Sequence, residues 1–326
     1  MSKKKFFLAL LATVLTFCAV AGGVTVANIL YGSNLSSEIT QHLDKPTGEK
    51  ANILLMGLDE DKTRADTIMI VSLNPKENTI RLLSVPRDTQ VTANGKLIKI
   101  NSTMAYQRRE ELMIEKLREI TGMPIHYYAE IDFEGFKKVI DILGGVDYNV
   151  PYNMNYDDPT QNLHIHLTAG MQHLDGQAAH DFVRFRHNNG GSAPGEYVMG
   201  DPGRVSAQQN FLKELVRQKL QPQYITKAPE LMNEIYQYVT TNFTVADALK
   251  YIGMLETIDS DTLQTFVLPG ATKYEHNLWY YIYDAEDTRE LVHTEFGYLN
   301  GVSVTLPPKP TSSASASASA EPAGNN

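Results

Sequence analysis

A buried strand that ends on a carboxylate is the feature of this sequence that most constrains its fold. Residues 51–58 read ANILLMGL, an apolar run of strand length without a charged side chain, and Asp59 follows directly. Such a run, closed by a polar residue, is typical of a buried strand. We therefore expect a strand over 51–58 that presents Asp59 at its C-terminal end.

A predicted hairpin adds two more charged residues to the same region. Residues 67–73 and 79–85 are rich in β-branched and apolar side chains, and the turn sequence NPKEN lies between them. This pattern predicts two antiparallel strands. Asp66 precedes the first strand and Arg87 follows the second, so these two residues should be neighbours in space although 21 positions apart.

The rest of the chain alternates between helical and extended patterns, which favours a sheet covered by helices. Asn101 or Ser102 is a plausible cap for the first helix, and Gly122 and Pro124 are its stop signals. We therefore predict an α/β (α+β) fold with a mixed sheet flanked by helices. The helices are expected over 102–121, 133–143, 175–183, 205–220, 244–258 and 284–296, and further strands over 127–131, 146–150 and 262–268.

The N-terminus predicts export. Three lysines, Lys3 to Lys5, precede residues 6–31, which contain no charged residue. About 20 apolar residues suffice to cross a bilayer, and the lysines would remain in the cytoplasm. We favour a retained transmembrane helix over 6–31 with a cytoplasmic tail at 1–5. Cleavage after Ala19-Val20-Ala21, or a lipoprotein signal at Cys18, are the alternatives, and all three place the remaining chain outside the cell.

The exported part divides into a linker, a folded domain and a tail. Residues 32–50 are expected to tether the domain at 51–306, and the Pro/Ser/Ala tract at 307–326 is expected to be disordered. The only cysteine is Cys18, so disulfides cannot stabilise the domain. A formal net charge of −9 argues against nucleic acid as a partner, because no basic face is indicated.

Arginines beside carboxylates predict a site for phosphate and a divalent metal. Arg184 and Arg186 flank Phe185, and at i and i+2 of an extended segment they would point the same way. Arg204 and Gln208 lie near the start of a predicted helix, whose amides would add donors for an anion. Guanidinium groups match phosphate oxygens two at a time, while carboxylates suit Mg²⁺ bridged to a diphosphate.

Five motifs in this order resemble the LytR-CpsA-Psr family of bacterial cell-wall glycopolymer ligases. The resemblance is clearest over residues 51–220. Its motifs are Asn52 to Asp59 (NILLMGLD), Arg64 to Thr67 (RADT), Leu83 to Thr89 (LSVPRDT), Val183 to His187 (VRFRH), and Gly200 to Arg204 (GDPGR) with Gln208-Gln209.

The resemblance implies an extracellular, Mg²⁺-dependent transferase on the single-pass cell membrane of a Gram-positive bacterium. Such enzymes move a teichoic acid or capsular polysaccharide from a polyprenyl pyrophosphate carrier in the membrane lipid to peptidoglycan, through a phosphodiester bond. By motif match, Asp59 and Asp66 would hold Mg²⁺, with Asp66 also catalytic. Arg87, Arg184, Arg186 and Arg204 would bind the pyrophosphate with Gln208, and Asp201 would orient them.

Some assignments stay open at this point. The base that activates the acceptor hydroxyl could be Asp66 or Asp88, and Asp88 could instead cap the turn beside Arg87. A pyrophosphatase that uses water, or a sensor of lipid-linked precursors without turnover, would share the same pocket. His164 and His166 lack a third ligand at a suggestive spacing for zinc. The aromatic run at 279–283 could contact sugars, but it is expected to fill a core or a sheet face.

Overall fold

The structure is a computed structural model of the chain. It describes residues 43–44, 50–160, 162–195, 197, 201–219, 235, 237–244, 247, 251, 263–300 and 302–303. The predictions for the tail at 1–5, the membrane segment at 6–31, most of the linker at 32–50, most of the helix at 244–258 and the tail at 307–326 fall on residues that it does not describe. Among the helices that it does describe, none is long and apolar enough to cross a membrane.

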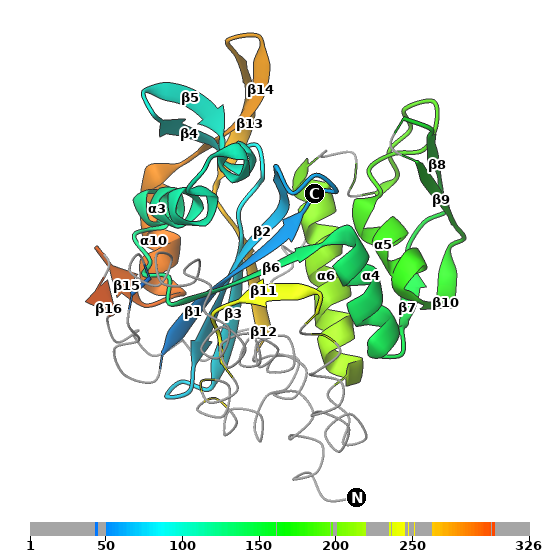
Figure 1. The fold of residues 1–326 in the computed structure, drawn as a ribbon, viewed down its shortest axis with the longest axis horizontal. Helices are drawn as coiled ribbons and strands as arrows, with labels where there is room; N and C mark the ends of the chain where they lie inside the picture. Colours follow the sequence, from blue (N-terminus) through cyan, green and yellow to red (C-terminus); the bar gives the residue numbers. More distant parts are fainter. Residues whose placement is uncertain are drawn as a thin grey trace, which may run out of the picture.

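A mixed sheet of six strands forms the centre of the molecule, in the order β11-β6-β1-β2-β3-β12. β1 pairs antiparallel with β2 and parallel with β6, and β3 pairs parallel with β12. This arrangement confirms the predicted mixed sheet (Figure 1). The strands are β1 Ala51–Leu58, β2 Ala65–Asn74, β3 Thr79–Ser84, β6 Tyr127–Asp132, β11 Val239–Thr241 and β12 Leu263–Val267.

The β2–β3 hairpin has the predicted position and pairing. Met69 pairs with Ser84 in its antiparallel register, and the Val85 amide donates to the Ile68 carbonyl at 2.9 Å beyond the last rung. Because β1 is antiparallel to β2, the end of β1 at Leu58 lies opposite Ala65. The end of β1, the start of β2 and the end of β3 therefore share one edge of the sheet.

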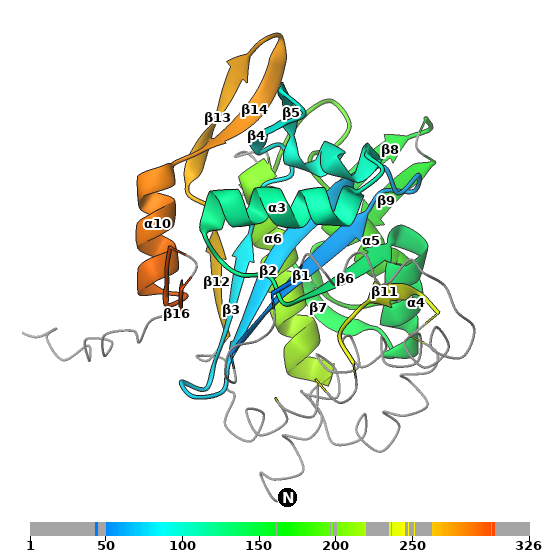
Figure 2. The same cartoon turned by 60° about the vertical axis from the view of Figure 1, so that its left-hand side comes forward.

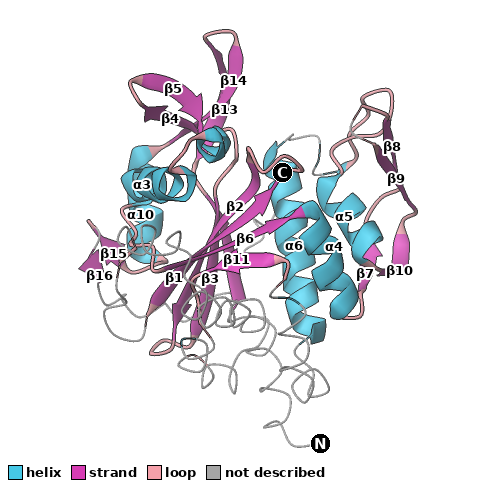
Figure 3. Ribbon diagram, in the orientation of Figure 1, coloured by secondary structure: helices cyan, strands magenta, loops and turns pink. Residues whose placement is uncertain are grey.

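Helices cover both faces of the sheet, and two hydrophobic cores lie beneath them (Figures 1 and 3). The first core lies under α3 and α10 and includes Leu54, Ile70 and Leu117, all buried. The second lies under the other three helices and includes Val139, Phe182 and Phe211. The helices are α3 Arg109–Thr121, α4 Phe133–Ile142, α5 Gly176–Arg184, α6 Asp201–Lys219 and α10 Ala285–Thr294.

Aspartate caps explain why several helix starts could be predicted. The carboxylates of Asp132 and Asp175 accept hydrogen bonds from the amides of Gly135 at 2.7 Å and Ala178 at 2.8 Å. Asp284 accepts from two amides at the start of α10. Each cap satisfies donors that have no partner within their helix.

The predicted helix over 102–121 is wrong in its first part. A 3-10 helix, η1, spans Ile100–Ala105, and Tyr106 then takes an extended conformation before α3 begins at Arg109. Two hydroxyls explain the break, since Ser102 donates to the Lys99 carbonyl at 2.6 Å and Thr103 to the Ile100 carbonyl at 2.8 Å. Such local bonds compete with the α-helical ladder.

Several short hairpins were not predicted. Three of them rise from the edge of the sheet where β1 ends (Figures 1 and 2). Their strands are β4 Gln90–Ala93 with β5 Lys96–Lys99, β8 Met154–Asp158 with β9 Leu163–Leu167, and β13 Gly270–Glu275 with β14 Leu278–Tyr283. The strand predicted over 146–150 is confirmed as β7 Val146–Val150, and its partner β10 Gly170–Leu174 was not predicted. β15 Tyr298–Leu299 pairs with β16 Val302–Ser303.

A buried histidine at the opposite edge of the sheet makes the stability depend on pH. His126 is 4% exposed, and its Nδ1 accepts a hydrogen bond from the Asn52 amide at 2.8 Å, which requires an unprotonated Nδ1. Burial lowers the pKa of His126 from 6.5 to about 4, against the opposing charge of Asp44. The folded state therefore resists a proton that the unfolded state takes up below pH 6.5.

We predict that the free energy of unfolding falls between pH 6.5 and pH 4 by about 2–3 kcal/mol because of His126 alone. Urea unfolding across this range should show the fall in the wild-type protein and a shallower slope in His126→Gln. Lowered carboxylate pKa values contribute equally to both proteins, so the difference in slope isolates the histidine. Parallel slopes would contradict the assignment.

Candidate functional site

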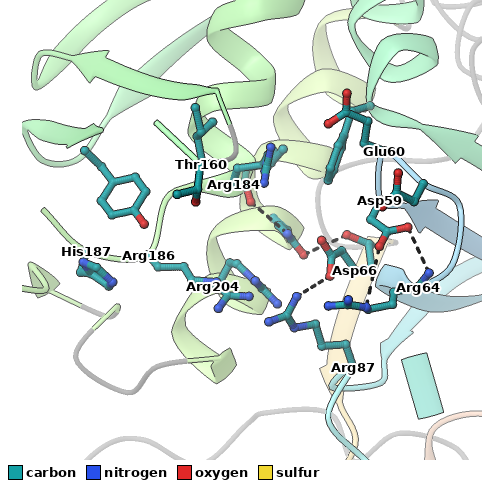
Figure 4. A pocket seen from close by; sticks show the side chains of 17 residues that line it. Asp59, Glu60, Arg64, Asp66, Arg87, Thr160, Arg184, Arg186, His187 and Arg204 are labelled. Atoms are coloured by element: carbon teal, nitrogen blue, oxygen red, sulfur yellow. Dashed lines mark hydrogen bonds and ion pairs between the residues drawn. The ribbon is translucent and has the colours of Figure 1, made fainter. Parts of the chain in front are cut away.

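A charged cavity of about 560 Å³ opens at the edge of the sheet where β1 ends (Figure 4). Five arginines and four carboxylates line it, together with polar and aromatic side chains. The lining residues are Asp59, Glu60, Asp61, Arg64, Asp66, Thr67, Arg87, Phe133, Tyr156, Thr160, Leu163, Val183, Arg184, Arg186, His187, Arg204 and Gln208. Side chains from β1, β2, α5 and α6 and their flanking loops thus meet in one place.

Asp66 and Arg87, which the predicted hairpin places side by side, both line the cavity. Asp66 is the second residue of β2, and Arg87 follows β3 after two further residues. Their side chains form an ion pair through Arg87 Nη1 and Asp66 Oδ1 (Figure 4). The prediction that these residues are neighbours is confirmed, and the ion pair places a guanidinium beside a carboxylate at the cavity wall.

Arg184 and Arg186 both line the cavity, but not for the reason expected. Arg184 is the last residue of α5 and not part of an extended segment, so the premise of a shared extended face was wrong. Phe185 leaves the helix with a ψ of 142° and buries its ring completely in the second core. The buried ring anchors the chain between the two arginines. The Arg184 guanidinium also lies 4.4 Å from the centre of the Phe133 ring, a cation–π contact.

Arg204 enters from the first turn of α6, which begins at Asp201 and not at Val205 as expected. Arg204 is only 5% exposed. One turn further along, Gln208 joins α6 to its neighbours: its Nε2 donates to the Val183 carbonyl at 3.0 Å, and its Oε1 lies 3.5 Å from the Thr67 hydroxyl. The amide of Gln208 therefore braces the segment that carries Arg184. The side chain of Asp201 is not among those that the structure describes.

Burial gives Arg184 and Arg204 a strong demand for an anion. Desolvation lowers the pKa of Arg184, while the nearby carboxylates of Asp66 and Asp181 oppose that shift. A guanidinium stays charged at any physiological pH, so a buried one must be compensated by anionic groups. The five arginines of the lining outnumber its four carboxylates, so a negatively charged ligand can complete the charge balance. Phosphate oxygens suit the guanidinium fork.

Asp59 organises the loop that closes one side of the cavity. Its Oδ1 accepts hydrogen bonds from the amides of Thr63 at 2.8 Å and Arg64 at 3.0 Å. Its Oδ2 lies 3.9 Å from Arg64 Nε and only 3.5 Å from the Thr63 hydroxyl. One oxygen is thus committed to the loop, and the other faces groups at longer range.

The described side chains can hold Mg²⁺ only with help from a ligand. Among them, no group of three His, Cys, Asp or Glu side chains is arranged to bind a metal ion. Asp59 and Asp66 both line the cavity and offer at most two carboxylates. Mg²⁺ is commonly held by one or two carboxylates together with substrate phosphates and water. The donor set therefore fits an ion shared with a diphosphate, and does not fit a metal bound by the protein alone.

Asp88, the other predicted acid, is not among the residues that line the cavity. Its Oδ1 lies 3.1 Å from Lys99 Nζ on β5 and 4.0 Å from Arg87 Nε. This position lets Asp88 hold Arg87 from behind. Of the two acids considered as a base, Asp66 is the one that lines the cavity.

Contacts around the loop at 59–64 involve residues that were not predicted to belong to the site. Lys62 forms an ion pair with Asp132 at 2.9 Å, and its carbonyl accepts from Arg109 Nη1 at 3.1 Å. Arg109 also pairs with the buried carboxyl of Glu130 at 3.1 Å. Burial, and then the neighbouring Glu110, raises the pKa of Glu130. These contacts join segments far apart in sequence, so no local pattern indicates them.

Arg64 and the β8–β9 side of the cavity were also missed as site residues. Arg64 appears in a predicted motif without a role, yet its side chain lines the cavity, with His187 on the opposite wall (Figure 4). Tyr156 also lines the cavity, and its ring packs edge-on against His187. His164 and His166 are not among the described residues that line the cavity. Both lie close to Asp157, at 2.6 Å and 3.3 Å, on the exposed face of the β8–β9 hairpin.

Comparison with known proteins gives a consistent result. Residues 24–296 match the LytR_cpsA_psr family. TagU of Bacillus anthracis, a polyisoprenyl-teichoic acid–peptidoglycan teichoic acid transferase, is 31% identical over 301 residues, which cover 86% of this chain and 92% of TagU. TagV of Bacillus subtilis, of the same description, is 28% identical over 274 residues, which cover 80% of this chain and 67% of TagV.

The fold agrees with solved structures. The crystal structure of B. subtilis TagV superposes with a TM-score of 0.62 at 26% identity, and the match covers 76% of this chain and 97% of that one. A Streptococcus agalactiae protein, gbs0355, has the same TM-score at 18% identity, which shows the fold alone. With a family match over most of its length and a mixed sheet that carries the arginine cavity, this chain belongs to the LytR_cpsA_psr family.

Proposed function

We propose that this protein transfers a teichoic acid or a related glycopolymer from a polyprenyl diphosphate carrier to peptidoglycan, forming a phosphodiester bond. The observation that carries the proposal is the convergence of Arg87, Arg184 and Arg204 on one cavity that also holds Asp66. The relatives TagU and TagV are described as teichoic acid transferases that act on peptidoglycan, which supports the choice of substrates.

The arginines suit the charge that develops in this reaction. A sugar hydroxyl of the acceptor attacks the phosphorus next to the glycan, and the bond from that phosphorus to the bridging oxygen breaks. The carrier leaves as polyprenyl phosphate. Charge builds on the phosphoryl and leaving oxygens, where preorganised cations stabilise it most. Phe133 and Gln208 help to fix Arg184 and its segment, so little reorganisation is needed.

Asp66 is best placed to receive the proton of the acceptor hydroxyl. It faces the cavity, whereas Asp88 is turned toward Lys99. The ion pair with Arg87 holds the Asp66 carboxylate in place. We assign Asp88 to positioning Arg87 and keep Asp66 as the proton acceptor.

Mg²⁺ is the proposed cofactor, and Asp59 with Asp66 would hold it against the diphosphate. When bound, the ion would neutralise charge on the diphosphate oxygens. The Arg64 amide donates to the Asp59 carboxylate and the Lys62 carbonyl accepts from Arg109, so the protein itself holds the Asp59 loop in position. The residues that precede the described domain would anchor the protein in the membrane of a Gram-positive cell, with the cavity outside.

A reconstituted reaction tests the function directly. Full-length protein is incubated with Mg²⁺, a polyprenyl-diphosphate-linked glycan and peptidoglycan oligomers, and the products are read by mass spectrometry. A glycan joined to peptidoglycan through phosphate is the expected product. Free glycan phosphate would instead identify a hydrolase, and carrier that is bound but unchanged would identify a sensor.

Arg184→Ala should lower the rate of transfer by about 10²–10³-fold, because it removes one preorganised donor from the reacting phosphate. The thermal unfolding temperature should change little, since the substitution removes charge from a cavity. Arg217→Ala is the matched control: Arg217 lies on the surface of α6 and pairs with Glu214, and its loss should leave the rate unchanged. Equal rates for wild type and Arg184→Ala would contradict the role.

Chelation of divalent cations should abolish transfer, and added Mg²⁺ should restore it. Asp59→Asn and Asp66→Asn should each raise the Mg²⁺ concentration for half-maximal diphosphate binding by about tenfold, which corresponds to one weakened ligand. Calorimetry of an inorganic diphosphate analogue with and without Mg²⁺ measures this. Asp287→Asn, in the first turn of α10, serves as control. A diphosphate affinity that is the same with and without Mg²⁺ would contradict the proposed role of the metal.

A further inference from the structure

The β13–β14 hairpin exposes an aromatic pair. Tyr274 and Trp279 are directly opposite each other in the strand register, and they are 57% and 58% exposed. Their ring centres lie 5.2 Å apart with 55° between the planes. The run at 279–283 was expected to fill a core or a sheet face: Tyr280 and Tyr281 are buried, whereas Trp279 lies on an exposed face of the two-stranded sheet.

The hairpin projects from the body of the molecule at the same edge as the cavity (Figures 1 and 2). None of its described residues lines the cavity, so it is a separate surface. Large aromatic side chains left in water are costly unless something covers them, and Tyr and Trp are favoured where a binding partner is both apolar and polar. The pair is therefore a candidate binding surface.

A fixed base joins the hairpin to the arginine site. The Tyr281 amide donates to the Asp88 carbonyl at 2.9 Å, and its hydroxyl donates to the Leu268 carbonyl at 2.6 Å. Thr89 forms a parallel bridge with Tyr281. Asp88 follows Arg87 directly, so the turn that carries Arg87 also carries the hairpin. By strand alternation, Tyr274 and Trp279 share one face of the hairpin with Tyr281.

We propose that this aromatic face binds a glycan strand, and that it holds the polymeric acceptor beside the cavity. The carbon–hydrogen faces of sugar rings carry partial positive charge, which matches the negative faces of aromatic rings. Two rings in a row suit a repeating polymer better than a single sugar. The choice of an acceptor glycan rests on the proposed function, but the binding itself does not depend on turnover.

The shape of the tip favours a glycan over a membrane. The turn itself consists of His276 and Asn277, both with positive φ, and Glu275 precedes it. A hairpin that inserts into lipid would place its apolar side chains at the tip, and a carboxylate there would oppose insertion. The aromatic pair lies along one side of the hairpin, below this polar turn, where an extended chain can lie across it.

The start of the described domain supports the same choice. The Asp44 amide donates to the Ile125 carbonyl at 3.0 Å, just before β6 begins. β6 runs parallel to β1, so this contact lies at the edge of the sheet opposite the cavity. The chain that leads back to the predicted anchor thus joins the domain at the end away from the hairpin.

The single tryptophan of the chain gives a direct test. Because Trp279 is the only one, fluorescence of the full-length protein that is excited at wavelengths where tyrosine does not absorb reports this surface alone. Titration with uncrosslinked peptidoglycan glycan strands should shift the emission in a saturable way, and Tyr274→Ala should weaken the affinity by about tenfold. Leu278→Ala is the matched control, since Leu278 is 50% exposed on the opposite face of the same hairpin.

Other outcomes overturn the proposal. Vesicles of dibrominated phosphatidylcholine that quench Trp279, with no response to glycan, would identify a membrane contact instead. An equal loss of affinity in Leu278→Ala and Tyr274→Ala would indicate non-specific hydrophobic adsorption to the tip. Arg184→Ala should bind glycan as the wild type does, so a failed transfer reaction and a failed glycan surface are told apart. No change of emission with any glycan strand would refute the surface.

Discussion

Backbone pairing among β1, β2 and β3 determines where the charged groups on the sheet side of the cavity lie. β1 runs antiparallel to β2, and β2 runs antiparallel to β3, so the end of the first strand, the start of the second and the end of the third share an edge. This register alone places Asp59, Asp66 and Arg87 at the same edge of the sheet. A slip by one residue would turn Ile68 and Ile70 out of the first core and Asp66 away from Arg87. Burial of the strands therefore protects the geometry of the site.

The second half of the site depends on the packing of α5 and α6 on the other face of the sheet. Phe182, Phe185 and Phe211 are buried in the second core and fix the two helices. Arg184 and Arg204 lie where these helices meet the edge of the sheet. Gln208 of α6 joins the two helices through its hydrogen bond to the Val183 carbonyl of α5. The cations lie in a partly desolvated cavity because apolar packing holds them there. Anionic ligands can complete the charge balance that the carboxylates leave open.

Much of this could be predicted from sequence where the signal is local. The strand at 51–58, the β2–β3 hairpin and the helices capped by Asp132, Asp175 and Asp284 have short-range causes. Contacts such as Arg109 with Glu130 could not be predicted, because their partners come from different elements. The short hairpins were missed because their strands are only two to six residues long, although β9 (LHIHL) does alternate between buried and exposed residues. Arg184 lines the cavity from a helix end, so its place there does not come from the extended geometry that the sequence suggested.

The central claim is that separate motifs build one diphosphate site. A crystal structure of the protein with a short-chain polyprenyl diphosphate and Mn²⁺ in place of Mg²⁺, with the metal located by anomalous scattering, tests it most directly. The account predicts phosphate oxygens between Arg87, Arg184 and Arg204, and the metal within reach of Asp59 and Asp66. A diphosphate bound elsewhere, or in this cavity without contact to these arginines, would contradict it.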